Sequence, residues 1–219
     1  LFLAVFIAAC ATAPKLTQEE ILSQNEKIAN LDKGLNDART QGADYLAPEG
    51  YKSAAAQLDL AMSEAASGRI DSANRAAQTG LNGLPKVSRD VEQSNDLLRE
   101  VLAARTRAMK AGAATLYSKD TANLEDDLRK TTALVERGRL EDVKKRRPKL
   151  LAGYEQLELI SLKEGMVDTA KATLEKAKQN GAAKYAPKTY KLAEEEMTLA
   201  LNVLDADRTK TEKANTHAA

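Results

Sequence analysis

Apolar residues recur along most of this chain at steps of three, four and seven residues, with polar residues between them. A stripe with this spacing lies on one face of a helix and buries that face against a neighbour. The pattern is clearest after residue 69, where five aliphatic residues follow one another at seven-residue steps: Ile70, Ala77, Leu84, Val91 and Leu98. Seven-residue spacing favours left-handed, coiled-coil-like packing. The chain is therefore expected to consist of packed helices.

Residues that start and stop helices divide this pattern into segments. Thr17 and Glu20 have the spacing of a capping box, which opens a helix. Gly42 and Gly181 suit the left-handed position just past a helix end, and each is followed by a proline that suits a first turn. Together these signals predict helices at 17–41, 48–67, 70–110, 118–136, 139–179 and 187–206. Gly80, Gly83 and Pro85 are expected to kink or break the helix around 82–86, and a second break is expected near Pro148.

One stretch of the chain occurs more than once. Residues 38–54 return 139 residues later as 177–193, with eight of 17 positions identical: Ala38, Gly42, Ala43, Ala47, Pro48, Tyr51, Lys52 and Ala54. A weaker copy begins at Ala108, about halfway between, so the period is about 70 residues. The predicted fold is all-α, an elongated antiparallel helical bundle made of a coiled-coil-like repeat of about 70 residues. Short connections place successive helices antiparallel, and a helix of about 40 residues is ~60 Å long.

The composition narrows the function classes. The 33 Lys and Arg residues against 32 Asp and Glu leave a net charge of +1, which does not favour gripping nucleic acid through bulk charge. Aromatic residues make up only 4% of the chain, and a single cysteine and a single histidine, His217, are present. This leaves no thiolate metal cluster and little basis for histidine catalysis. No cofactor, no metal site and no catalytic residue is predicted, and the chain is expected not to be an enzyme.

The charged runs have a structural interpretation. Lys144–Arg147 is the densest basic run, but four consecutive helical residues point in four directions, so a solvated surface is expected rather than a nucleic-acid patch. Contact with anionic lipid headgroups stays open as an alternative. Acidic runs at 125–127 and 194–196 lack the glycine and loop spacing of a calcium loop. Within the first of them, Glu125 and Asp126 are expected to pair with Arg129 and Lys130 four residues on.

The N-terminal residues have the pattern of a targeting segment. Residues 1–9 are an uncharged apolar run with the length of a signal-peptide core, too short to span a bilayer. The run ends in Ile7, Ala8 and Ala9 followed by Cys10, which resembles the bacterial lipobox. On this interpretation the signal peptide is removed and Cys10 is acylated. The alternative is an ordinary signal-peptidase cut after Ala13, which Pro14 disfavours.

These signals divide the chain into four segments. Residues 1–9 are expected to form a lipoprotein signal peptide with a truncated start, and 10–16 a lipidated tether. Residues 17–208 are expected to form the helical repeat region, and 209–219 a tail that is either a natural end or a truncation. Ala11 stands where an aspartate would favour retention in the inner membrane. The expected location is therefore the cell envelope, lipid-anchored, with the outer membrane facing the periplasm as the default.

The pattern Gly-Ala-x-x-Φ-Ala-Pro-x-x-Tyr-x-x-Ala, present from Gly42 and again from Gly181, resembles a bacterial envelope lipoprotein family of unknown function. Members carry a lipobox and helices that start with Ala-Pro-x-x-Tyr-x-x-Ala, often ahead of an OmpA-like peptidoglycan-binding domain. The middle copy departs from the pattern, with Tyr117-Ser118 in place of Ala-Pro, and no OmpA-like segment is visible. The resemblance implies an envelope location and a helical architecture, and it implies no active site.

The sequence therefore predicts a non-enzymatic, membrane-anchored lipoprotein acting as a helical spacer, scaffold or protein-interaction module. Its expected partners are membrane lipid, through acylated Cys10, and either another envelope protein or itself, with no nucleic acid. The alternative is an adaptor similar to tetratricopeptide proteins that holds a peptide or amphiphile between helices. Tyr51 and Tyr190, each at the start of an apolar stripe, are possible interaction residues. In an adaptor the groove would be lined by Tyr45, Tyr51, Tyr185 or Tyr190.

Overall fold

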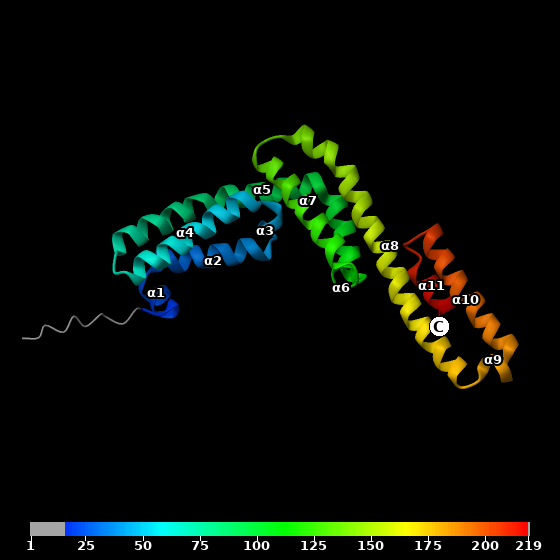
Figure 1. The fold of residues 1–219 in the computed structure, drawn as a ribbon. Coiled ribbons are helices and arrows are strands. Elements are labelled where there is room, and N and C mark those ends of the chain that lie inside the picture. Colours follow the sequence, from blue (N-terminus) through cyan, green and yellow to red (C-terminus); the bar gives the residue numbers. More distant parts are fainter. Residues whose placement is uncertain (1–15, 219) are drawn as a thin grey trace, which may run out of the picture. The chain divides into compact units, whose positions relative to one another are not determined.

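The computed structural model describes residues 16–218, and every regular element in that range is an α-helix (Figure 1). The all-α prediction is confirmed. The helices are, in order, α1 (Gln18–Gln24), α2 (Glu26–Thr40), α3 (Ala43–Leu46), α4 (Pro48–Ala66), α5 (Ile70–Lys110), α6 (Ala113–Leu116), α7 (Ser118–Glu136), α8 (Leu140–Gln179), α9 (Ala182–Tyr185), α10 (Pro187–Ala206) and α11 (Thr211–Ala218). None of them is long and apolar enough to cross a membrane, as far as the described residues go.

The predicted 70-residue period is visible in the backbone. Gly42, Gly112 and Gly181 adopt left-handed φ angles of 81°, 90° and 82°, and each stands between a longer helix and a four-residue helix. Gly68 and Gly138 adopt φ angles of 74° and 70° in the turn before the next long helix. Such angles strain any residue with a Cβ atom, so glycine is required at these five places. Each repeat thus consists of a long helix, a short helix, a second long helix and a turn.

The observed helices differ from the predicted ones in four places. The first predicted helix is interrupted at Asn25, whose side-chain amide donates to the Ile21 carbonyl oxygen over 2.8 Å. The kink predicted at 82–86 is wrong, because α5 runs through that stretch and its one non-helical residue is Leu98. The break near Pro148 is also wrong: α8 continues through this residue, held on both sides by buried Val143 and Leu150. The segment predicted as a tail contains helix α11.

The described chain divides into two compact units, each with its own core. Unit 1 contains residues 16–44 and 48–89, and unit 2 contains residues 45–47 and 90–218. In unit 1 the helices α1, α2 and α4 and the first half of α5 pack around small and aliphatic side chains. Its buried apolar residues are Ile21, Ile28, Leu31, Leu35, Ala54, Ala61, Ala65, Ala73, Ala76 and Ala77.

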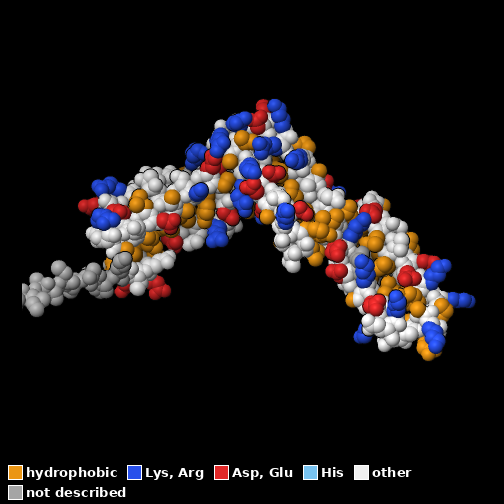
Figure 2. Space-filling view, in the orientation of Figure 1, with side chains coloured by type: hydrophobic (Ala, Val, Ile, Leu, Met, Phe, Trp, Pro, Cys, Tyr) orange, Lys and Arg blue, Asp and Glu red, His pale blue; other side chains and the backbone are white. Residues whose placement is uncertain are grey.

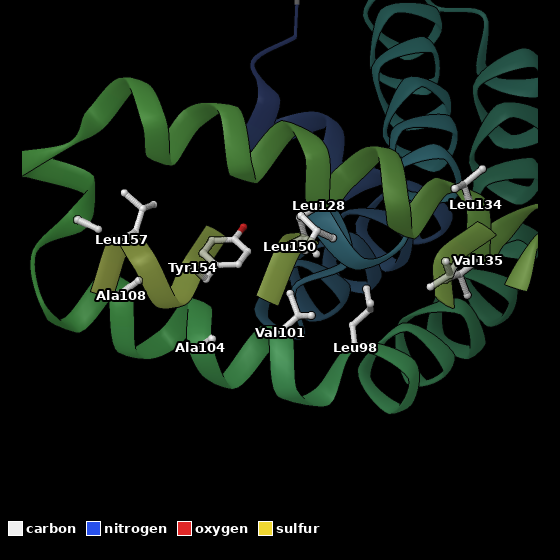
Figure 3. Packing of buried hydrophobic residues seen from close by; sticks show 12 residues of the cluster. Leu98, Val101, Ala104, Ala108, Leu128, Leu134, Val135, Leu150, Tyr154 and Leu157 are labelled. Carbon is white, nitrogen blue, oxygen red and sulfur yellow. The ribbon is translucent and has the colours of Figure 1, made fainter. Parts of the chain in front are cut away.

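Unit 2 has a core of larger side chains between the second half of α5, α7 and α8. The buried cluster consists of Leu98, Val101, Ala104, Ala108, Ala113, Leu128, Leu134, Val135, Val143, Leu150, Tyr154 and Leu157. Figure 3 shows Tyr154 projecting from α8 into the row of aliphatic side chains, opposite Ala104 and Ala108 of α5. Farther along α8, three alanines and one leucine are buried on α8, α10 and α11: Ala170, Ala200, Leu204 and Ala214.

Candidate functional site

The predicted lipidation site lies outside the described residues. Cys10 and the preceding Ile7, Ala8 and Ala9 all fall in the undescribed N-terminal stretch, so acylation stays a prediction. The helical body begins seven residues after the cysteine, at the capping box that the sequence predicts. The Thr17 amide donates to the Glu20 carboxylate over 2.8 Å, and the Glu20 amide donates to the Thr17 hydroxyl over 3.3 Å. These hydrogen bonds lower the pKa of Glu20 below its usual range.

The two tyrosines predicted as interaction residues lie in different units. Tyr51 is half-buried against the core of unit 1, and Tyr190 is half-buried on α10 in unit 2. Tyr45 is half-buried beneath the Arg105 guanidinium, which stands 4.4 Å from the ring centroid. Tyr185 lies largely in solvent beside the Lys184 ammonium. Within unit 2, Tyr45 and Tyr185 therefore have separate surroundings and do not line one groove.

A partly buried ionic cluster joins three helices of unit 2. Arg105 of α5 binds Glu125 of α7 with two hydrogen bonds, from Nε to Oε1 over 2.7 Å and from Nη2 to Oε2 over 2.8 Å. The hydroxyl of fully buried Tyr154, on α8, donates to the same Oε1 over 2.8 Å. We call Arg105, Glu125 and Tyr154 the ionic triad. The predicted Glu125–Arg129 pair is therefore wrong, since both carboxylate oxygens are held by other helices.

The surroundings of the ionic triad keep Arg105 charged and Tyr154 neutral. The hydrogen bonds from Arg105 to Glu125 raise the pKa of the guanidinium, which keeps it charged. Burial raises the pKa of Tyr154 far above its usual range, and the neighbouring Glu125 carboxylate adds to the effect. A tyrosine held neutral in this way donates a hydrogen bond and cannot act as a base at neutral pH. The triad thus has the properties of a structural link rather than of an acid–base pair.

A second ionic group ties α8 to its neighbours. The almost fully buried Glu158 accepts hydrogen bonds from Arg107 of α5 over 2.9 Å and from Arg208 over 3.2 Å. Arg208 also pairs with Glu155. Arg208 belongs to the short connection between α10 and α11. This group fixes that connection to α8 through charge-assisted hydrogen bonds.

The short segment Tyr45–Ala47 makes contacts in unit 2 that the sequence analysis did not predict. It belongs to unit 2, where Leu46 is 1% exposed and Ala47 is fully buried. Ser94 of α5 donates its hydroxyl to the Leu46 carbonyl oxygen over 2.7 Å. The hydroxyl of Thr132, on α7, donates to the Tyr45 carbonyl oxygen, also over 2.7 Å. We call this segment the docking segment, because the connection of one repeat is held by the helices of the next.

An open pocket of about 500 Å³ lies in unit 2 between the last part of α8, the end of α5 and α11. Its apolar lining includes Leu162, Met166 and Ala111. The hydroxyl of Ser161 is fully buried at this pocket and has no hydrogen-bond partner among the described residues. A buried hydroxyl without a partner is uncommon in proteins.

Several residues of the charged runs form ion pairs within their own helix or with a neighbouring helix. Lys144 pairs with Glu141 over 2.7 Å, and Arg147 reaches Glu100 over 2.5 Å. The predicted pair of Asp126 with Lys130 is confirmed, with a separation of 2.5 Å. Figure 2 shows basic and acidic side chains interspersed over the visible face. In the described range no group of three His, Cys, Asp or Glu residues is arranged to hold a metal ion.

Comparisons of the chain with protein-family models, with curated proteins and with solved structures gave no match.

Proposed function

We propose that this chain is a lipid-anchored helical scaffold of the bacterial cell envelope, with no catalytic role. One observation carries the proposal. Ile7, Ala8 and Ala9 precede Cys10 at the end of an apolar run, and a capped helix begins only seven residues later. A short tether followed directly by packed helices suits a protein that is held at one end and extends away from a membrane. Membership of the resembled lipoprotein family is part of this proposal.

The energetics of acylation support a durable anchor. Each buried methylene contributes ~0.8 kcal/mol, so one acyl chain binds reversibly, whereas two or more hold a protein on the bilayer. A diacylglycerol on the Cys10 thiol together with an amide-linked chain belongs to the second case. Such an anchor needs no transmembrane helix.

The buried polar groups also support a structural role. Arg105, Glu125 and Tyr154 bind one another across three helices, and Glu158 binds two arginines. Each of these side chains uses its hydrogen-bonding capacity to hold helices together. The partner of the scaffold is a second envelope protein or another copy of the chain.

The test of the anchor is expression of the gene from its own start in a bacterial host, followed by membrane fractionation and mass measurement. We expect the protein in the membrane fraction, with a mature N-terminus at Cys10 and the added mass of three acyl chains. Cys10→Ser is expected to release it or leave it unprocessed. Ala11→Ser, the matched control, is expected to stay anchored. A water-soluble product beginning at Pro14, unchanged by Cys10→Ser, contradicts the proposal.

The alternative function is an adaptor that binds an amphiphile between helices, and the pocket beside Ser161 favours it. The pocket combines apolar lining residues, Leu162 and Met166, with polar ones such as Lys110 and Asn215, which suits an acyl chain with a polar end. The test is the melting temperature of the protein with a fatty acid or a lysophospholipid. An adaptor gains stability that Met166→Asp abolishes, because a ligand that binds only the folded state stabilises it. A scaffold shows no such shift.

A further inference from the structure

The docking segment has a counterpart in each later repeat, and the equivalent side chain is more exposed in each successive copy. Leu46 is 1% exposed, Leu116 at the equivalent place is 40% exposed, and Tyr185 in the third copy is 78% exposed. The second connection is held only in part, by a hydrogen bond of 3.4 Å from the Tyr117 hydroxyl to Glu164 of α8. In the third copy Ala186 is exposed as well, whereas its equivalent Ala47 is fully buried. We call Lys184–Ala186 the plug.

The surface that receives the docking segment also has a counterpart, in unit 1. The hydroxyls of Ser94 and Thr132 hold the docking segment, and Leu128 lies buried one turn before Thr132. Seventy residues earlier the same places are occupied by Gln24, Met62 and Leu58. There the structure has an open pocket of about 360 Å³, lined by Gln18, Ile21, Leu58, Asp59, Met62 and Ala66. We call this pocket the socket.

The plug and the socket match in chemistry. Tyr185 offers an exposed aromatic ring to a pocket with an Ile, Leu and Met lining. Gln24 stands where Ser94 stands in the docked pair, and its exposed side-chain amide can donate to a carbonyl oxygen in the same way. Lys184 and the nearby Lys188 give the plug side a positive charge, whereas Asp59 and Glu19 make the socket side acidic. Opposite charges around an apolar centre give a contact both orientation and register.

We propose that the plug of one copy of this chain docks into the socket of a second copy, head to tail. The contact repeats between molecules the interface that the docking segment makes within unit 2. It uses two different surfaces of each chain, so it is heterologous, and further copies can add at either end. The inference rests on the scaffold part of the proposed function and not on the lipid anchor.

The test is sedimentation velocity of the 219-residue chain carrying Cys10→Ser, so that association is measured without acylation. We expect species larger than a dimer to grow in as the concentration rises. Tyr185→Asp is expected to weaken the association ~30-fold, the effect of losing a central aromatic anchor. Because Tyr185 is exposed, this variant keeps its fold. Leu199→Asp, which changes a 45% exposed residue of α10, is the matched control and is expected to associate as the parent does.

A mixing experiment distinguishes head-to-tail docking from a symmetric dimer. Tyr185→Asp removes the plug, and Asp59→Lys places a positive charge in the socket. Each variant alone is expected to be monomeric, but an equal mixture retains one working plug and one working socket. The mixture is therefore expected to form a heterodimer and nothing larger. Lys184→Glu combined with Asp59→Lys restores opposite charges and is expected to regain growth beyond the dimer.

Two results overturn the inference. One is that the chain sediments as a monomer at every concentration and that Tyr185→Asp does not change its sedimentation. The other is an association that the plug and socket variants leave unchanged, which places the contact elsewhere. Neither result bears on the anchor, since Cys10→Ser is present throughout. Conversely, a soluble processed protein that still associates head to tail removes the anchor and keeps this inference.

Discussion

Three equivalent positions of the first and second repeats hold opposite kinds of side chain. In unit 2 they are Arg105, Glu125 and Tyr154, the ionic triad. Seventy residues earlier, in unit 1, they are Leu35, Ala55 and Leu84, all three in or against an apolar core. One backbone pattern therefore accommodates either an apolar contact or a bidentate ion pair with a buried tyrosine. The backbone repeat does not determine which of the two is used.

The two units also fill space differently. In unit 1 a Cβ atom placed on Gly80 would stand 2.6 Å from Cδ2 of Leu31, and one on Gly34 would stand 2.4 Å from Cδ1 of Leu84. The corresponding residues of unit 2 are Leu150 and Ala104, both buried. At these two positions unit 1 has a glycine beneath a leucine where unit 2 has a larger side chain, whereas unit 2 uses the same arrangement elsewhere, at Gly153 beneath Leu124. The same backbone repeat therefore accommodates side chains of different size at equivalent positions.

The largest expected effect comes from breaking the ionic triad. Glu125→Ala leaves the partly buried Arg105 without its carboxylate and Tyr154 without its acceptor. We expect a loss of ~3 kcal/mol in the free energy of unfolding, measured by urea denaturation. The matched control is Asp126→Ala, next in sequence, which removes a solvent-exposed pair and is expected to change the free energy of unfolding far less. Equal losses in the two variants would show that the triad adds nothing to stability.

A second variant makes unit 2 resemble unit 1 at these positions. Combining Arg105→Leu, Glu125→Ala and Tyr154→Leu installs the apolar residues found seventy positions earlier. We expect the triple variant to recover ~2 kcal/mol of the loss in Glu125→Ala, because no unpaired charge stays buried. The same urea titration measures it. A triple variant less stable than Glu125→Ala contradicts the equivalence of the two units.

Two glycines of α5 sharpen the comparison of packing. A methyl group added to Gly83 would meet no atom within 4 Å, so Gly83→Ala is expected to gain ~0.7 kcal/mol from helix propensity. Gly80→Ala meets the fully buried Leu31, so overpacking outweighs that gain and the variant loses ~0.8 kcal/mol. Thermal unfolding of both variants measures the difference. Equal effects would remove the close-packing role of Gly80.

The smallest expected effect is at alkaline pH. The pKa of Tyr154 is raised by burial above its unfolded value near 10, so the folded state keeps a proton that the unfolded state loses. This contribution is complete below pH 10 and is lost as the pH rises above it. Between pH 10 and 10.5 it removes ~0.4 kcal/mol from the free energy of unfolding. Tyr154→Phe is expected to show a shallower decline over this interval, and an identical slope in the two proteins contradicts the assignment.

Much of the fold could be predicted from the sequence because local rules decide it. The apolar spacing placed the long helices, and the repeated glycines marked turns that need a left-handed residue. The prediction of a kink at 82–86 was wrong, because the presence of Gly80, Gly83 and Pro85 does not show whether a glycine bends the helix or makes room for a neighbouring side chain. Gly80 does the latter.

The interactions between distant segments could not be predicted. Arg105 is a charged residue on an apolar stripe, but its partner Glu125 lies 20 residues farther along the chain. The four-residue spacing within the helix predicted Arg129 as the partner of Glu125 instead. The docking segment is held by hydroxyls 48 and 87 residues away, and serine and threonine are too common to signal such bonds. Only the comparison of equivalent positions in the three repeats identifies the plug and the socket.

The measurement that tests the proposed role as an extended scaffold, or spacer, most directly is small-angle X-ray scattering. The data are extrapolated to zero concentration so that self-association does not contribute. A compact protein of this length has a radius of gyration of ~17 Å. The 40 residues of α8 alone extend over ~60 Å. We therefore predict a radius of gyration well above the compact value and an asymmetric distribution of interatomic distances. A radius close to ~17 Å with a symmetric distribution contradicts a spacer.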